Sequence, residues 1–137
     1  MRAYICGFSG LVGSFIAGLF GGWDAAMATL LMFMGIDYIT GLLVAAFNKS
    51  PKSDTGALNS YVGFKGLAKK CVVLLLVLVA VRLDIMLNTN YVRDAVCVAF
   101  SVNELISILE NAGILGVPIP DVIKDAIEVL KNSGKKG

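Results

Sequence analysis

A few polar side chains lie inside the apolar parts of the sequence, and their chemistry limits what the protein can do. They are Asp37, Thr40, Arg82, Asp84, Asn103 and Glu104. The sequence has no His, and no hydroxyl or thiol stands in a pattern that pairs a nucleophile with a base. The three cysteines (Cys6, Cys71 and Cys97) lack metal-ligand spacing, so we interpret them as small apolar residues. We therefore expect no enzyme activity, no metal and no cofactor, and we interpret the six polar residues as intramembrane polar or gating groups.

The composition predicts the environment in which these groups must be held. Of the 137 residues, 57% are hydrophobic and only 16% are charged, whereas about 25% is usual for soluble domains. A small soluble domain has too little interior to hide so much apolar surface. We therefore expect an all-α integral membrane protein, with lipid as the solvent of its outer face.

Apolar segments divide residues 1–112 into a predicted transmembrane domain, with helices at about 3–22, 25–47, 67–87 and 91–109. A secretory signal peptide is the alternative for the first, but its apolar run is longer than usual. The fourth segment carries several charges, among them Arg93 and Asp94. We expect a small helical bundle of three to four transmembrane helices, and prefer four crossings.

The connection predicted at 48–66 is basic, and with its flanks it contains Lys49, Lys52, Lys65, Lys69 and Lys70. A short lysine-rich loop between membrane segments is typical of the cytoplasmic side. With four crossings, both termini are then cytoplasmic. We consider this explanation better than a nucleic-acid-binding patch, and expect no nucleic-acid partner.

The last part, residues 113–137, is predicted to be a C-terminal amphipathic helix and a basic tail. A Gly- and Pro-containing break precedes Asp121, which is a plausible N-cap. Val122, Ile123 and Ile127 fall on one face of that helix, and Lys124 and Glu128 fall on the other. Such a helix suits a membrane surface or a partner, and we expect the tail after it to be disordered.

Small residues recur along one face of the first segment at intervals of four and three. They are Ala3, Gly7, Gly10, Ser14, Ala17 and Gly21, and Gly18 with Gly22 adds a GxxxG pair beside them. Small side chains let membrane helices approach closely. We interpret this as a helix-packing face, used within one chain or between chains.

Asp37 needs a partner because an isolated charge within a bilayer is costly. The sequence distance from Asp37 forward to Asn48 equals the distance from Cys71 forward to Arg82. In antiparallel helices both charges would be about 16 Å from the inner interface. We hypothesise that Asp37 pairs with Arg82 of the same or a neighbouring subunit, as a gating element or as a purely structural ion pair.

Several short motifs resemble one known family. They are Asp37-Tyr38 with Thr40-Gly41, Gly63 with Lys65-Gly66 and Lys69-Lys70, Leu83-Asp84, Asn103-Glu104-Leu105, and Pro118-Ile119-Pro120. Together they make residues 30–131 similar to the bacteriophage lysis and toxin-secretion holins, while the first segment matches only loosely. The resemblance implies a protein of the bacterial cytoplasmic membrane that forms homo-oligomers. It would open a pore or lesion that releases an endolysin or a large toxin, without necessarily contacting it.

Two other functions remain open at this point. A small proton-coupled, multidrug-type transporter would also use a few short helices and an intramembrane carboxylate. A passive membrane scaffold would co-purify with a fixed partner and would not harm cells. A collapse of the membrane potential on expression would favour a holin over both.

Overall fold

The computed structural model of the chain describes residues 1–49 and 59–135, and this part is entirely helical apart from its connections. Its five helices are α1 (Arg2–Leu19), α2 (Ala25–Ala46), α3 (Ser60–Leu87), α4 (Val92–Ile114) and α5 (Asp121–Lys135). No strand is present in these residues. The predicted all-α class is therefore confirmed.

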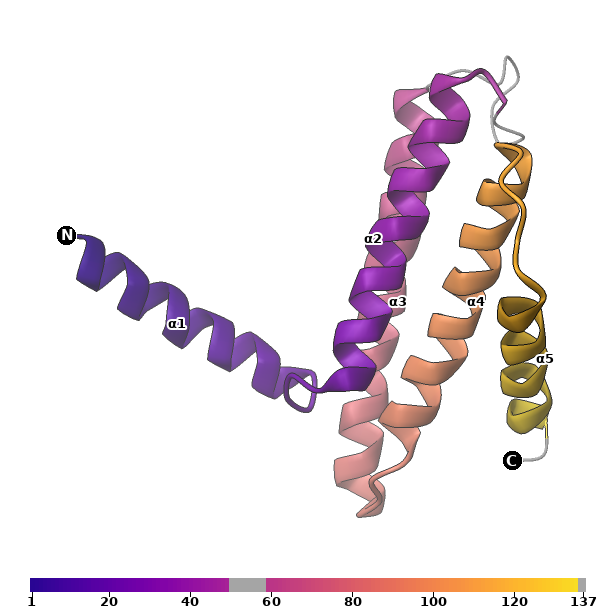
Figure 1. Cartoon of the computed structure of the whole chain (residues 1–137). Coiled ribbons are helices and arrows are strands. Elements are labelled where there is room, and N and C mark those ends of the chain that lie inside the picture. The colour runs from indigo at the N-terminus through magenta and orange to yellow at the C-terminus, as the bar shows by residue number, and fades with distance from the viewer. Residues whose placement is uncertain (50–58, 136–137) are drawn as a thin grey trace.

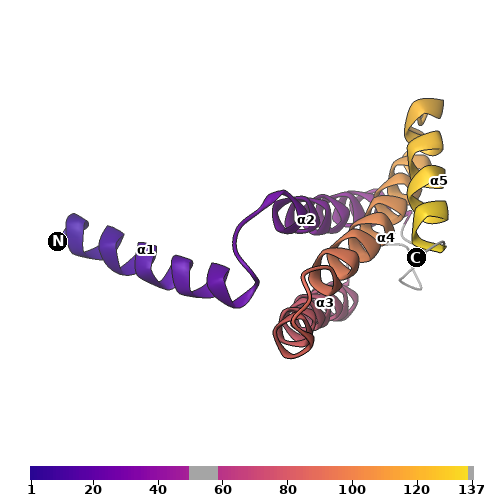
Figure 2. The same cartoon turned by 90° about the horizontal axis from the view of Figure 1, so that it is seen from below.

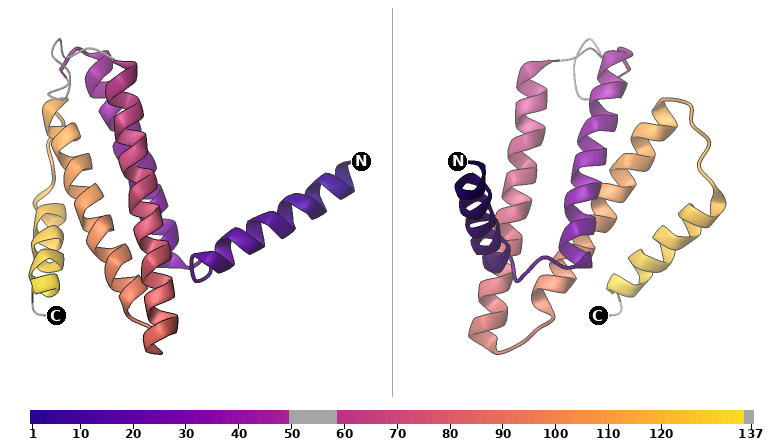
Figure 3. Two further views of the ribbon diagram at one scale, coloured as in Figure 1. Left: turned by 180° about the vertical axis from the view of Figure 1, so that it is seen from behind. Right: turned by 60° about the vertical axis from the view of Figure 1, so that its left-hand side comes forward.

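Helices α2, α3 and α4 form the bundle, and α1 projects away from it (Figure 1). The view from below separates the three bundle helices and shows α1 leaving from one end of α2 (Figure 2). Figures 1 and 3 show α2 and α4 running in one direction and α3 in the other, while α5 turns back beside α4. The bundle thus has three helices, with one extra helix at each end of the chain.

The core of the bundle is a small apolar cluster contributed by all three helices. Its buried members are Met27, Leu30, Met34, Val77 and Cys97. Cys97 packs there like any small apolar side chain, whereas Cys6 and Cys71 are exposed. This core holds α2, α3 and α4 at the spacing that the polar residues described below require.

The outer surface is apolar to a degree unusual for a soluble bundle. Phe8, Met32 and Leu75 are each more than half exposed, and such large exposed apolar areas normally mark a contact with lipid or protein. Two helices, Arg2–Leu19 and Ala25–Ala46, are long and apolar enough to cross a membrane. Helices α3 and α4 carry more charged residues and are not among these two helices. The prediction of three to four crossings therefore stays a prediction.

Helix α3 begins at Ser60, well before the predicted start at 67. The reason is an N-cap: the Oδ1 atom of Asn59 accepts hydrogen bonds from the amides of Tyr61 at 2.9 Å and Val62 at 3.4 Å. Residues 60–66 therefore belong to the helix and not to the predicted loop. This change places Lys65 on α3 and sets Lys69 and Lys70 well inside the helix, away from its start.

The helices near the C-terminus also differ from the predicted ones in their bounds. Helix α4 continues to Ile114, beyond the predicted end at 109. The carbonyl of Pro120 accepts from the amides of Ile123 and Lys124, so Asp121 lies in the first turn of α5 and does not cap it. A carboxylate there still interacts favourably with the helix dipole. The helix also extends to Lys135, through part of the tail that we expected to be disordered.

The turn between α1 and α2 contains two glycines in the left-handed region. Gly21 has φ 82° and Gly22 has φ 97°, a conformation that side chains other than Gly rarely adopt. Both residues lie outside α1, which ends at Leu19. The prediction that they belong to a continuous helix-packing face is therefore wrong at these two positions.

Candidate functional site: a polar network inside the bundle

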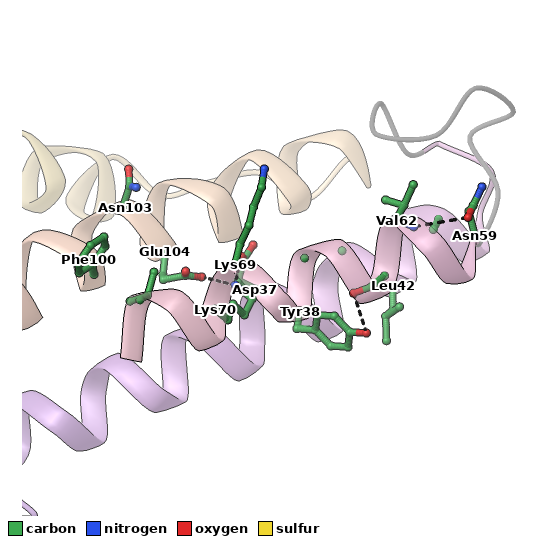
Figure 4. Close-up of a pocket in the computed structure, with 15 residues that line it drawn as sticks. Asp37, Tyr38, Leu42, Asn59, Val62, Lys69, Lys70, Phe100, Asn103 and Glu104 are labelled. Carbon is green, nitrogen blue, oxygen red and sulfur yellow. Dashed lines mark hydrogen bonds and ion pairs between the residues drawn. The ribbon is translucent and has the colours of Figure 1, made fainter. Parts of the chain in front are cut away.

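One lysine joins the three bundle helices through two carboxylates. The Nζ atom of Lys70 on α3 lies 2.7 Å from Oδ2 of Asp37 on α2 and 2.7 Å from Oε2 of Glu104 on α4. The three side chains are between 11% and 14% exposed. Figure 4 shows Lys70 and Glu104 pointing toward Asp37 across the interface. Each helix of the bundle therefore supplies one charged group to a shared, largely buried network.

Asn111 completes the network on the α2–α4 side. Its Nδ2 atom donates to Oδ1 of Asp37 at 3.1 Å and to Oγ1 of Thr40 at 2.9 Å. The hydroxyl of Thr40 in turn donates to the carbonyl of Ile36 at 2.8 Å. Among the described residues, no buried side-chain nitrogen or oxygen lacks a hydrogen-bond partner. The network is thus fully bonded within one chain.

The charges of the network do not balance when all three groups are ionised. Asp37 and Glu104 contribute two negative charges and Lys70 contributes one positive charge. Buried ion pairs gain little net free energy, because desolvation offsets most of the attraction. In a bilayer the cost of the unbalanced charge would be larger still. The fit of the three side chains therefore keeps the network together, and hydration of these charged groups would lower its free energy.

A cavity of about 330 Å³ lies beside this network, between α2, α3 and α4. Asp37, Lys70 and Glu104 form part of its wall, and Asn103 also lines it. Room for the cavity comes partly from glycine, since a Cβ atom at Gly66 would meet nothing within 4 Å. Polar groups and space for water therefore coincide beside the network, in a cavity that extends toward Asn59 at the start of α3.

A second polar cluster fixes the turn between α1 and α2. Arg93, at the start of α4, is only 6% exposed. Its guanidinium forms two hydrogen bonds with the carboxylate of Asp24, at 2.6 and 3.0 Å. It also donates to the carbonyls of Phe20 at 2.7 Å and Gly22 at 3.1 Å. We call this set of contacts the Arg93 clasp.

Asp24 also caps α2, since Oδ1 accepts from the amide of Met27 at 3.0 Å. The hydrogen bond from Arg93, followed by that from Met27, lowers the pKa of the Asp24 carboxyl below its ordinary value of 3.8. The clasp is therefore ionised over the whole physiological pH range.

Asp84 performs a similar capping role at the other end of α3. Its carboxylate accepts from the amides of Val92 at 3.0 Å and Arg93 at 2.9 Å, and from the hydroxyl of Thr89 at 2.6 Å. It thus closes the α3–α4 turn and caps α4. Asp84 lies apart from the Lys70 network. Its carboxylate binds groups of the α3–α4 turn and does not pair with Arg82.

The structure brings together only some of the polar residues that the sequence singles out. Asp37, Thr40 and Glu104 meet in the network, and Asn103 lines the cavity from an exposed position. Arg82 is exposed and forms no ion pair within residues 1–49 and 59–135. The predicted pairing of Asp37 with Arg82 is therefore wrong within one chain. Lys70, which precedes Arg82 on the same helix by about 18 Å, takes that place.

The other predicted groups have the following positions. Lys65 and Lys69 are exposed on α3, Lys49 follows the end of α2, and Lys52 lies outside the described residues. On α1, a Cβ atom at Gly7, Gly10 or Gly18 would meet nothing within 4 Å, and the whole helix has no buried residue. The predicted packing face is thus uncovered over most of α1, although Ala17 is half-buried.

Sequence reasoning missed three residues of these clusters. It assigns Lys70 to the basic loop, treats Arg93 only as a charge that weakens the fourth segment, and places Asn111 beyond the end of that segment. The Asn59-Ser60 pair is a usable N-cap signal that moves the start of α3 to Ser60 and places Lys70 well inside the helix, away from the predicted helix end. Nothing in the local sequence indicates the Arg93 clasp.

The chain is similar in sequence to a known family of proteins. Residues 14–132 match the sequence profile described as the bacteriophage holin family. The chain belongs to the bacteriophage holin family. A probable holin of Bacillus phage phi105 is 34% identical over 104 residues, which cover 75% of this chain and 72% of the relative. The holins are non-enzymatic proteins that permeabilise membranes, and membership together with the apolar helices indicates a membrane protein.

Bacterial relatives are also similar over most of their length. An uncharacterised 14.9 kDa protein in the nagH 3′ region of Clostridium perfringens is 39% identical over 123 residues, covering 88% of both chains. The uncharacterised protein Lmo0128 of Listeria monocytogenes is 42% identical over 124 residues, covering 90% of this chain and 81% of the relative. No solved structure matches the chain.

Proposed function

We propose that this protein is a functional holin of the bacterial cytoplasmic membrane. It assembles with other copies and opens a pore or lesion through which an endolysin or a large toxin leaves the cell. The observation that carries the proposal is the inverted polarity of the bundle: the outer face is apolar, while Asp37, Lys70 and Glu104 meet inside. Family membership and the relative named as a probable holin support it.

The proposed topology follows from charge. The end of the bundle that carries Lys49 and Lys65 faces the cytoplasm, by the excess of positive charge in cytoplasmic loops. Helices α2, α3 and α4 cross the membrane, and α1 provides a fourth apolar segment. The N-terminus and the end of α4 then lie on the cytoplasmic side.

The network gives this assembly a physical basis for opening. Within one chain the polar groups satisfy one another but stay in a low-dielectric interior, where hydration is lost. A regrouping of helices that exposed them to a water-filled lumen would restore that hydration while the apolar faces stayed in lipid. The cavity beside Lys70 marks where water would first enter.

Inducible expression in bacteria tests the proposal. A voltage-sensitive dye reports the membrane potential, and a co-expressed endolysin without a secretion signal reports passage of a folded enzyme. We expect an abrupt loss of potential, and lysis only when both proteins are present. Continued growth with an intact potential would contradict the proposal.

One observation favours the alternative of a small proton-coupled transporter. The cavity has two carboxylates in its wall, as an ion-coupled binding site would require. The same experiment separates the two functions, because a transporter leaves cells growing and does not let an enzyme escape.

A further inference from the structure

Helix α1 carries a set of small residues that its own chain leaves mostly uncovered. This small-residue face consists of Ala3, Gly7, Gly10, Ser14 and Ala17. Ala17 is half-buried and lines a cavity with Met27 and Leu31 of α2, and the other four residues are exposed. Cβ atoms built at Gly7 and Gly10 would meet open space, and α1 has no buried residue. With 18 residues, α1 is about 27 Å long. Helix α1 is therefore long and apolar, and its small-residue face from Ala3 to Ser14 is open to another helix.

Helix α2 carries a complementary set on the side that faces away from the bundle. This outer stripe consists of Thr29, Met32, Ile36, Ile39 and Leu43, all exposed. Met32 is 64% exposed and Ile39 is 59% exposed, whereas Met34 and Asp37 on the opposite side are buried. The stripe repeats at intervals of three and four, which is the seam of a helix that packs lengthwise against another helix.

The two sets mirror each other about Trp23. In sequence, Trp23 lies midway between Gly10 and Ile36, and also midway between Gly7 and Ile39. The remaining three pairs obey the same rule. When an α1 lies antiparallel to an α2 in this register, each small residue faces one member of the stripe. Small residues opposite larger ones are the arrangement that brings membrane helices into close contact.

The structure keeps α1 away from the stripe of its own chain. The Arg93 clasp binds the carbonyls of Phe20 and Gly22, which lie at the end of α1 and in the turn. Helix α1 projects from the bundle (Figures 1 and 2). The outer stripe of α2 is therefore not occupied by α1 of the same chain. It is open to a helix of another molecule in the mirrored register.

We propose that the outer stripe of α2 is the docking surface for α1 of a second copy, with Gly10 of one chain against Ile36 of the next. The inference deepens the proposed function and rests on it, since it gives the contact through which the holin assembles. It is an exchange of one element between identical chains. Because each chain offers one small-residue face and one outer stripe, a chain can engage two neighbours, and growth need not stop at a dimer.

Cysteine cross-linking between differently tagged chains tests the docking. Both chains carry Cys6→Ser and Cys71→Ser, while Cys97 stays because it is fully buried. One chain carries Gly10→Cys and the other Ile36→Cys, and the two are co-expressed and oxidised in membranes. We expect a disulfide-linked product that contains both tags, which contacts within one chain cannot produce.

Two controls fix the register and the face. Val12→Cys replaces Gly10→Cys in the first, which moves the thiol to the opposite side of α1 at nearly the same depth. This pair should give no product, because cysteines whose Cα atoms are more than about 7 Å apart cannot be bridged. The second control uses the cysteine pair Gly7→Cys and Ile39→Cys. Gly10→Leu, added to the chain with Gly7→Cys, should abolish the cross-link because a large side chain then lies on the docking face. Val12→Leu, added instead, should not change the cross-link.

The outcomes separate this inference from the proposed function. If both cysteines in one chain give only a faster-migrating monomer, α1 closes on its own α2 and the inference is wrong. Equal products from Gly10→Cys and Val12→Cys would also overturn it. Loss of membrane potential without the mixed product rejects the docking but keeps the holin function. The mixed product without loss of potential rejects the function but keeps the docking.

Discussion

The ammonium of Lys70 and the carboxylate of Asp37 lie 2.7 Å apart, although 33 residues separate them in the chain. With Glu104 they connect three helices whose outer faces are apolar. These contacts connect the three helices within one chain. They also place charged side chains inside the bundle, where the proposed pore would require them.

Removal of Lys70 should destabilise the bundle strongly. Lys70→Met leaves two buried carboxylates without a cation, and breaking a buried pair costs about 3–5 kcal/mol. The free energy of unfolding in detergent, followed by circular dichroism, measures this. The neighbouring Lys69→Met is the control, since Lys69 is exposed and should change stability by no more than about 0.5 kcal/mol. Equal effects would mean that Lys70 has no special role.

Replacement of the whole network should separate folding from opening. Asp37→Leu, Lys70→Met and Glu104→Leu together remove all three charges, and such apolar replacements are often neutral or stabilising. We expect a chain that inserts and folds but no longer depolarises cells at equal expression. Depolarisation with unchanged timing would remove the network from the mechanism.

Asn111→Leu should cost about 1–3 kcal/mol of stability, because Oδ1 of Asp37 and the hydroxyl of Thr40 each lose a buried partner. The change keeps a similar volume, so the loss reports the hydrogen bonds. The adjacent Glu110→Gln is a matched control at an exposed position. Thermal unfolding of both variants in the same detergent gives the comparison, and equal midpoints would contradict the assignment.

The Arg93 clasp should control the position of α1. Arg93→Lys cannot reproduce the paired contacts with Asp24 and the two carbonyl contacts, so α1 should move more freely about the turn. Trp23 is the only tryptophan and reports this directly through its fluorescence anisotropy, which should fall. Arg82→Lys, at an exposed position, should leave the anisotropy unchanged.

The clasp should also weaken in acid. The folded pKa of Asp24 lies below 3.8, so its contribution to stability is fully present above that value. The contribution is lost as the pH falls through the lower, folded pKa. Trp23 emission should therefore be constant at neutral pH and change only below about pH 4. In Asp24→Asn this transition should be absent, and a transition that persisted would have another cause.

The sequence predicted the helical class and the starts of α1 and α2 to within a residue, and it singled out Asp37 and Glu104, which the structure brings together at Lys70. It did so because apolar length and the cost of a membrane charge are local properties. The partner of Asp37 was not predictable in this way. The inferred match with Arg82 counted depth from Cys71, whereas α3 begins at Ser60 after the cap at Asn59. The Arg93 clasp depends on α4 packing beside the α1–α2 turn, which no local pattern encodes.

The most direct test of the account is release from sealed vesicles by the purified protein. Vesicles of bacterial lipid are loaded with a small dye and with a labelled dextran of the size of a folded enzyme. We expect both to be released together once the protein reaches a threshold density in the membrane. Release of the dye or of protons alone, with the dextran retained at every density, would contradict this expectation.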